Sequence, residues 1–317
     1  MKQHFKKKKP GSEKIDAEVG YHIPVLLHET ISLLDIKPDG IYVDCTFGGG
    51  GHSRVILQQL NENGMLVAFD QDDDARKNLP EDKRVVFVPQ NFRHLQRFLR
   101  LHKITAVDGI LADLGVSSHQ FDEAERGFSI RFDAALDMRM DRRQELTAAD
   151  IIKEYTEEQL HKLFEQYGEV TNARTLAKTI VQQRQLTAIA TINGFKEAVR
   201  PVVKGNPHKY FAQVFQALRI EVNDELGALK DLLQQSPTLL KPFGRLAVIT
   251  FHSLEDRMVK NFFKSGSFSE TETNDLYGNK PESPFTIITK KPVVAAAAEI
   301  NRNTRARSAK LRVAEKR

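Results

Sequence analysis

The sequence predicts an α/β fold in which a parallel, doubly wound (Rossmann-like) sheet carries an inserted helical domain. Short apolar runs alternate with amphipathic helical patterns over residues 21–136 and again over 211–317. Such alternation is typical of a sheet covered by helices on both faces. Between these two parts, residues 137–210 contain almost only helical patterns. This interruption indicates a helical unit inserted into the sheet domain.

The individual elements follow from apolar periodicity and from start and stop signals. A helix is expected to begin near Pro24, a residue suited to the first helical position. Thr156 and Gln159 form a capping-box pattern ahead of another helix, and one long helix is expected to carry an apolar stripe from Val214 to Leu233. The strands are expected at 41–45, 65–69, 85–88, 107–112 and 246–249, with an extended pair near 285–289 and 308–313.

Composition narrows the class of protein. The chain has 317 residues, 40% of them hydrophobic, and its single cysteine, Cys45, falls in an expected strand, which fits a core residue in a reducing compartment. The basic start lacks the apolar core of a secretory signal, and no apolar run approaches the length of a membrane span, so a cytoplasmic location is expected. The net charge is +5, and lysines and arginines crowd both a flexible arm, 1–20, and the C-terminal segment. This distribution favours a nucleic-acid partner.

The most informative segment runs from 41 to 70. An apolar run is followed by a turn with four consecutive glycines. A helical pattern comes next, and a second apolar run ends in Asp70. Glycines let a backbone approach a ligand closely, and the helix N-terminus presents amide N–H groups. A carboxylate about 20 residues further on can accept hydrogen bonds from ribose hydroxyls. The layout predicts an adenosine cofactor.

The spacing also discriminates between cofactors. A dinucleotide fingerprint starting at Gly48 requires a third glycine at position 53, where the chain has Ser53. S-adenosylmethionine, which has no phosphate, is therefore the better candidate. Asp113 ends the fourth strand at the same edge of the sheet, and an irregular segment, 117–140, follows where a substrate loop is expected.

Several other polar residues have structural explanations. Asp72, Asp73 and Asp74 are expected to form the acidic first turn of a helix, and His52 is expected at the surface of another first turn. Ser253 is expected to start a helix through a capping box with Asp256 nearby. No metal site is expected, since no His/Cys cluster has ligand spacing.

Taken together, these segments resemble one family, the bacterial small-subunit (16S) ribosomal RNA N4-cytosine methyltransferases, often called MraW or RsmH. The resemblance extends over nearly the whole chain beyond the arm. The matching residues are 22–27 (HIPVLL), 46–53 (TFGGGGHS), Asp70, 108–110 (DGI), 113–118 (DLGVSS), 125–129 (ERGFS), 136–141 (LDMRMD), 215–220 (FQALRI), 244–246 (GRL), 251–257 (FHSLEDR) and 305–312 (RARSAKLR).

The resemblance implies a class I methyltransferase sheet with an inserted helical substrate-recognition domain, 137–210. It implies S-adenosylmethionine as methyl donor and a cytidine of the decoding region as acceptor, within the assembled or assembling small ribosomal subunit. Asp113 is the candidate catalytic residue. The implied cofactor contacts are Gly50, Gly51, His52, Asp70, Phe92, Asp113 and Gln120.

Three departures from the family pattern lie on the expected substrate side. His119 stands where proline is usual, Ala134 and Ala135 replace Gly-Pro, and 208–213 lacks the usual His-Pro and a later arginine. RNA positioning is therefore less closely specified by the resemblance than cofactor binding.

Two other functional classes share part of the pattern. A nicotinamide oxidoreductase has the same strand, turn and helix, but the missing third glycine argues against it. A ribosome-assembly factor without catalytic activity has basic termini but no need for glycines paired with Asp70. Cofactor protection in a melting assay and methyl transfer discriminate among the three.

Overall fold

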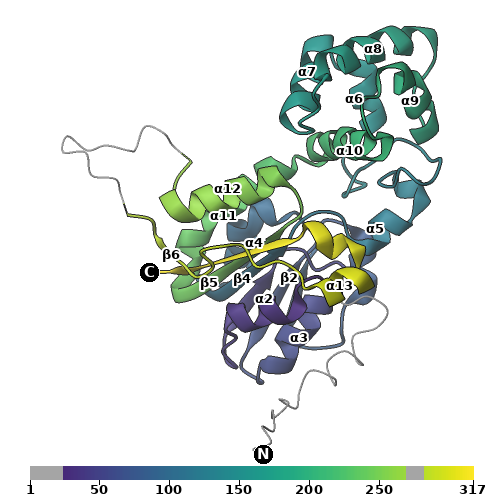
Figure 1. Ribbon diagram of the computed structural model, residues 1–317. Helices are drawn as coiled ribbons and strands as arrows, with labels where there is room; N and C mark the ends of the chain where they lie inside the picture. Colours follow the sequence, from purple (N-terminus) through teal and green to yellow (C-terminus); the bar gives the residue numbers. More distant parts are fainter. Residues whose placement is uncertain (1–23, 269–281) are drawn as a thin grey trace, which may run out of the picture.

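Seven strands form one sheet in the computed structural model, which describes residues 24–268 and 282–317 (Figure 1). Their order is β3-β2-β1-β4-β5-β7-β6, with β1 to β5 parallel and β7 antiparallel to both of its neighbours. The predicted α/β class is confirmed. The basic arm, 1–20, and the first two residues of the 22–27 motif lie outside the described residues. The strands are β1 (Ile41–Asp44), β2 (Met65–Phe69), β3 (Val85–Val88), β4 (Val107–Asp113), β5 (Leu240–Thr250), β6 (Phe285–Ile287) and β7 (Lys310–Lys316).

Helices cover both faces of this sheet. One face packs on α4 (Leu95–Leu101), α11 (Glu225–Leu239) and α12 (Ser253–Ser265). The other packs on α2 (Leu27–Leu34) and α3 (Gly51–Gln59), with the segment that holds α13 (Ala297–Arg302) beside them. Side chains alternate between the two cores along each strand, as the pleat requires, so that Val43 faces one core and Tyr42 the other.

The chain leaves the sheet after β4 and forms a separate helical unit before it returns at β5. Figure 1 shows α6 to α9 set apart from the sheet, with α10 beneath them. A core of its own, from Phe128 to Val222, holds this unit together. The capping box of Thr156 and Gln159 is confirmed at the start of α7. The helices are α6 (Ala148–Glu154), α7 (Glu157–Gln166), α8 (Ala173–Leu186), α9 (Ile192–Val199) and α10 (Pro207–Asn223).

The prediction of one long helix through Leu233 is wrong. The structure has two helices, α10 and α11, separated by Asp224, whose backbone adopts the left-handed conformation with φ 45°. Asp is among the few residues that tolerate this conformation. Both helices bury apolar residues, so the stripe continues across the break in the sequence. Its first half, including Leu218, packs in the helical unit, and its second half, including Leu229, packs under the sheet.

Within the described ranges, no helix is both long enough and apolar enough to cross a membrane. Cys45 is buried as expected, immediately after β1.

Candidate functional site

A cavity of about 760 Å³ opens at the carboxyl ends of β1, β2 and β4. Ligands of doubly wound sheets bind at this edge, where the connections of neighbouring strands run to opposite sides. The cavity wall combines the glycine turn after β1, the ends of β2 and β4, the segment 114–121, and residues 303–305 near the C-terminal strand. The segments that the sequence singled out as chemical therefore meet in one place.

The glycine turn is fixed from below by a buried carboxylate. Asp44, the last residue of β1, accepts hydrogen bonds from the backbone N–H of Thr46 (3.1 Å) and from the hydroxyl of Ser53 (2.7 Å). Gly50 has φ 73°, and a Cβ there would lie 2.8 Å from the ring of Phe47. A side chain is therefore excluded both by backbone conformation and by space.

Asp70 joins this turn to the next strand. Its Oδ2 accepts from the backbone N–H of Gly48 (2.7 Å), and its Oδ1 accepts from that of Asp72 (2.9 Å). Burial raises the pKa of this carboxyl group to about 7. Each oxygen keeps a further lone pair, so the group can accept from two more donors on the cavity side.

Two positions were open for His52, a surface site in a first turn and a contact with the cofactor, and the structure excludes the first. The helix α3 turns its imidazole inward, where the side chain is 6% exposed and Nδ1 lies 3.7 Å from Oδ2 of Asp113. Burial lowers the pKa of His52 to about 4, so the ring is neutral at pH 7. Its Nε2 has no hydrogen-bond partner among the described residues. The glycines before His52 have no side chains, so α3 can begin close to the cavity. The apolar periodicity of the sequence does not predict this burial of His52.

Asp113 is the last residue of β4. Its backbone N–H donates to Oγ1 of Thr46 (2.7 Å), which fixes the strand end against the glycine turn. Burial, with the nearby carboxylates of Asp44 and Glu255, raises the pKa of Asp113 well above its usual range. Within the described part of the chain, its Oδ1 has no hydrogen-bond partner. That oxygen is buried, whereas the side chain as a whole is 23% exposed at the cavity wall, so the carboxyl group of Asp113 can receive a ligand's N–H or O–H group there.

The two remaining single residues of the predicted set also line the cavity. Phe92 begins a short 3₁₀ turn and packs partly on the core under the sheet. Gln120 closes a capping box with Ser117 at the start of α5 (Ser118–Asp122), and its Nε2 donates to Oδ2 of Asp72 (2.7 Å). Of the seven predicted cofactor contacts, only Gly50 is outside the cavity lining, because it turns the chain behind Phe47. Their roles stay predictions.

The acidic run after Asp70 starts a helix, as predicted. It is a 3₁₀ helix, Asp73–Asn78, with Asp73 and Asp74 in its first turn and Asp72 as its cap. Oδ2 of Asp72 also accepts from Nη1 of Arg126 (2.7 Å), a fully buried guanidinium that donates to the carbonyls of Arg139 and Met140 as well. This contact ties the segment 117–140 to the cofactor side of the cavity. The sequence offered only the motif around Arg126 as a signal for it.

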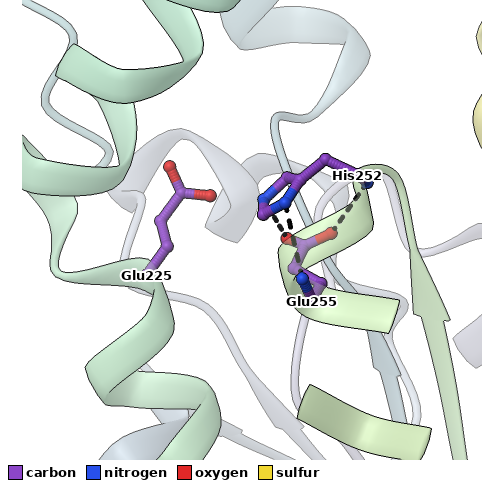
Figure 2. A group of neighbouring side chains, drawn as sticks. All are labelled: Glu225, His252 and Glu255. Atoms are coloured by element: carbon purple, nitrogen blue, oxygen red, sulfur yellow. Dashed lines mark hydrogen bonds and ion pairs between the residues drawn. The ribbon is translucent and has the colours of Figure 1, made fainter. Parts of the chain in front are cut away.

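The predicted capping box at Ser253 is wrong by one residue. His252 caps α12, and its Nδ1 accepts from the backbone N–H of Glu255 (3.4 Å). Glu255 in return accepts from the backbone N–H of Phe251 (2.8 Å). Burial raises the pKa of Glu255, but His252, the charge of Arg219 and the N–H of Phe251 outweigh it and hold this pKa below its usual range. Figure 2 shows His252 and Glu255 joined by these contacts.

Glu225 faces this pair from the start of α11 (Figure 2). Potential ligand atoms of Glu225, His252 and Glu255 lie within 4.8 Å of one another, a grouping that sequence spacing could not reveal. However, Arg219 donates to both carboxylate oxygens of Glu225, at 2.7 and 3.0 Å. The cation already present is a guanidinium, and we assign no metal to this cluster.

Comparison with known proteins agrees with this geometry. Residues 20–317 match the model of the MraW methylase family. A protein of Bacteroides thetaiotaomicron named "Ribosomal RNA small subunit methyltransferase H" is 55% identical over 300 residues, covering 94% of this chain and 98% of that protein. Proteins of the same name from Parabacteroides distasonis and Flavobacterium johnsoniae are each 54% identical, over 93% of this chain and 97% and 98% of theirs.

Proposed function

Because the chain belongs to the MraW methylase family, we propose that it methylates the exocyclic N4 amine of a cytidine in the decoding region of small-subunit (16S) ribosomal RNA, with S-adenosylmethionine as donor. One observation carries the proposal. A single cavity joins a glycine turn and Asp70, which suit an adenosine, to the partly exposed carboxyl group of Asp113, which suits an amine.

The residues present fit S-adenosylmethionine. Asp70 would accept from the ribose hydroxyls, Phe92 would lie against the adenine, and His52 and Gln120 would bind the remaining polar groups. The glycines admit the cofactor without a clash of side chains. When bound, the cofactor supplies an activated methyl group on a sulfonium, so the protein has only to align the acceptor and exclude water.

Asp113 is proposed to orient the acceptor. The lone pair of cytosine N4 is conjugated with the ring, which makes the amine a poor nucleophile. The carboxylate of Asp113, or a backbone carbonyl in 114–118, would accept from N4–H and turn the lone pair toward the methyl group. Because the pKa of Asp113 is raised, its carboxylate is also suited to take up the proton that N4 loses.

The target cytidine must be unpaired or flipped to enter the cavity. We propose that residues 137–210 orient the RNA of the assembled or assembling small subunit in the cytoplasm. Arg174, Lys178, Arg200 and Lys204 expose their side chains on this unit. Arg184, another basic residue of this unit, instead donates to the carbonyls of Ile152 (2.9 Å) and Tyr155 (2.7 Å), so its role is to hold α8 against α6.

The test is radiolabelled methyl transfer from S-adenosylmethionine to purified small subunits and to naked 16S rRNA, followed by digestion and identification of the nucleoside. We expect label in N4-methylcytidine. Label in another nucleoside would contradict the assigned acceptor. Tight cofactor binding without any transfer would favour a non-catalytic assembly factor.

A further inference from the structure

Two arginines from distant segments converge on one aromatic ring at the rim of the cavity. The guanidinium carbon of Arg305 lies 5.0 Å from the ring centre of Phe121, and that of Arg131 lies 5.6 Å from it. These distances are typical of cation–π contacts. Phe121 belongs to α5, Arg131 to the loop before the helical unit, and Arg305 to the turn before β7. All three line the cavity.

The hydrogen-bonding capacity of the two guanidiniums is far from used. Arg305 donates to the hydroxyl of Ser118 and to the exposed carboxylate of Asp122 (3.2 Å). Over residues 24–268 and 282–317, the side chain of Arg131 has no carboxylate partner, and it is exposed. A guanidinium has five N–H donors in a planar fork, so most of the donors remain available to a ligand.

The charges around Arg131 and Arg305 favour the binding of an anion. Two positive charges are held near the same ring, and one exposed carboxylate accompanies them. Contact with Phe121 holds both guanidiniums near one point of the rim, and their remaining N–H groups match phosphate oxygens. An anion between the two arginines would relieve their mutual repulsion.

Resting on the function proposed above, we propose that Arg131 and Arg305, held on the ring of Phe121, bind the phosphodiester backbone of the RNA next to the target cytidine. The cofactor side of the cavity is buried, as His52 and Gln120 show, whereas Arg131 is exposed and Arg305 is partly exposed at its rim. A nucleotide drawn into the cavity leaves its flanking phosphates at such a rim. These contacts would fix the register of the RNA without reading its bases.

The test compares wild type with Arg131→Gln, Arg305→Gln and the double variant in steady-state methylation of small subunits at several salt concentrations. We expect the double variant to raise the KM for subunits about tenfold or more, and to reduce the slope of log KM against log salt by about one for each phosphate that the variant no longer binds. The kcat and the affinity for S-adenosylmethionine should stay within about twofold of wild type. Arg305→Lys, which keeps the charge but loses the fork, should restore part of the KM.

The matched control is Arg97→Gln. Arg97 is an exposed arginine that lies 5.8 Å from the ring of Phe98, but on α4 and outside the cavity lining. Its KM and salt slope should equal those of wild type, and melting curves check that every variant is folded.

Three outcomes would overturn the inference. One is an unchanged KM and salt slope in the folded double variant. Another is a loss of cofactor affinity by calorimetry, which would assign the pair to the carboxylate of S-adenosylmethionine. The third is a fall in kcat alone. The activity of wild type separates these results from a failure of the proposed function. If the proposed function is wrong, wild type itself transfers no methyl group to subunits.

Discussion

At the scale of single residues, three carboxyl groups of one cavity differ in proton affinity because their partners differ. Glu255 accepts from two backbone N–H groups and faces His252, and its pKa is lowered. Asp70 also accepts from two backbone N–H groups, but burial dominates and its pKa rises to about 7. Asp113 has an unpaired oxygen, and its pKa is raised well above the usual range. The carboxyls with raised pKa values are those assigned to ligands.

Replacing Asp70 by Ala should weaken S-adenosylmethionine binding at least tenfold. The carboxylate is expected to make two charge-assisted hydrogen bonds to the ribose, each worth about 1.5–3 kcal/mol. Calorimetry measures the affinity, with Asp82→Ala as control, since Asp82 pairs with Arg84 outside the cavity lining. An unchanged affinity in a folded Asp70→Ala protein would remove Asp70 from the cofactor site.

The affinity for S-adenosylmethionine should rise with pH between about 6 and 8. Ribose hydroxyls require the ionised form of Asp70, whose pKa in the folded protein is about 7. The same shift acts on stability. The folded state binds more protons than the unfolded state between the ordinary pKa of 3.8 and about 7, so this group lowers stability as pH rises through that window. His52, with its pKa lowered from 6.5 to about 4, lowers stability as pH falls through its window.

The variant Asp70→Asn, which cannot ionise, isolates the effects of Asp70 from that of His52. The stability of the variant minus that of wild type should be larger at pH 8 than at pH 5. Thermal melts of both proteins at the two pH values measure this difference. Its residual cofactor affinity should no longer depend on pH near 7. A melting difference that is the same at both pH values would show that Asp70 is ionised throughout.

Asp113→Asn should lower kcat at saturating concentrations of both substrates. An asparagine presents an amide that donates where the carboxylate accepts from N4–H, and it cannot take up the proton. Single-turnover kinetics are required, because slow product release hides a chemical defect. If the saturated rate stays within a factor of about two of wild type, a difference of only ~0.4 kcal/mol in the barrier, Asp113 is a cofactor ligand alone.

At the scale of elements, the turn between α10 and α11 connects the helical unit to the sheet. Asp224 has φ 45°, and its carboxylate accepts from Nη2 of Arg93 (2.8 Å), which also binds Asp231 on α11. Asn223, one residue earlier, accepts from the backbone N–H of Met140 (2.7 Å). The angle at which the helical unit meets the cavity is therefore fixed by a few adjoining residues.

Replacing Asp224 by Val should destabilise the protein by about 1–2 kcal/mol, because a β-branched residue is strained in the left-handed conformation. Asp224→Asn is the matched control. It also loses the ion pair with Arg93, but asparagine tolerates this conformation, and an exposed pair contributes less than about 1 kcal/mol. Urea unfolding followed by circular dichroism measures both. Equal losses in the two variants would attribute the effect to charge rather than to the backbone.

The exposed charges of the helical unit give a separate prediction. We expect a fourfold variant to have a higher KM for subunits and a weaker salt dependence of that KM, with cofactor affinity unchanged. In this variant Gln replaces Arg174, Lys178, Arg200 and Lys204. Arg184 is left in place, because its loss would leave carbonyls unpaired and disturb the fold. An unchanged salt dependence would assign RNA binding to other surfaces.

At the scale of the whole molecule, the sequence predicted what depends on neighbours along the chain. The apolar runs of β1 to β4 and the polar residues that end β2 and β4 follow from local pattern. Features that depend on contacts across the fold could not be predicted. The first turn of α3 buries the imidazole of His52 within 3.7 Å of Asp113, and the helix breaks at Asp224 where its apolar stripe passes from one core to the other. The meeting of Phe121 with Arg305 joins segments that nothing in the sequence pairs.

The order of strands in the sheet also bears on how the chain can fold. β4 and β5 are neighbours in space, yet the whole helical unit is synthesised between them. A long disordered connection would make their pairing slow, since closing a loop costs entropy that grows with its length. The helical unit has its own core, so it can fold first and bring the two ends of that connection together. On this view its packing acts as a folding scaffold for the sheet, and defects in that distant core would delay formation of the cavity.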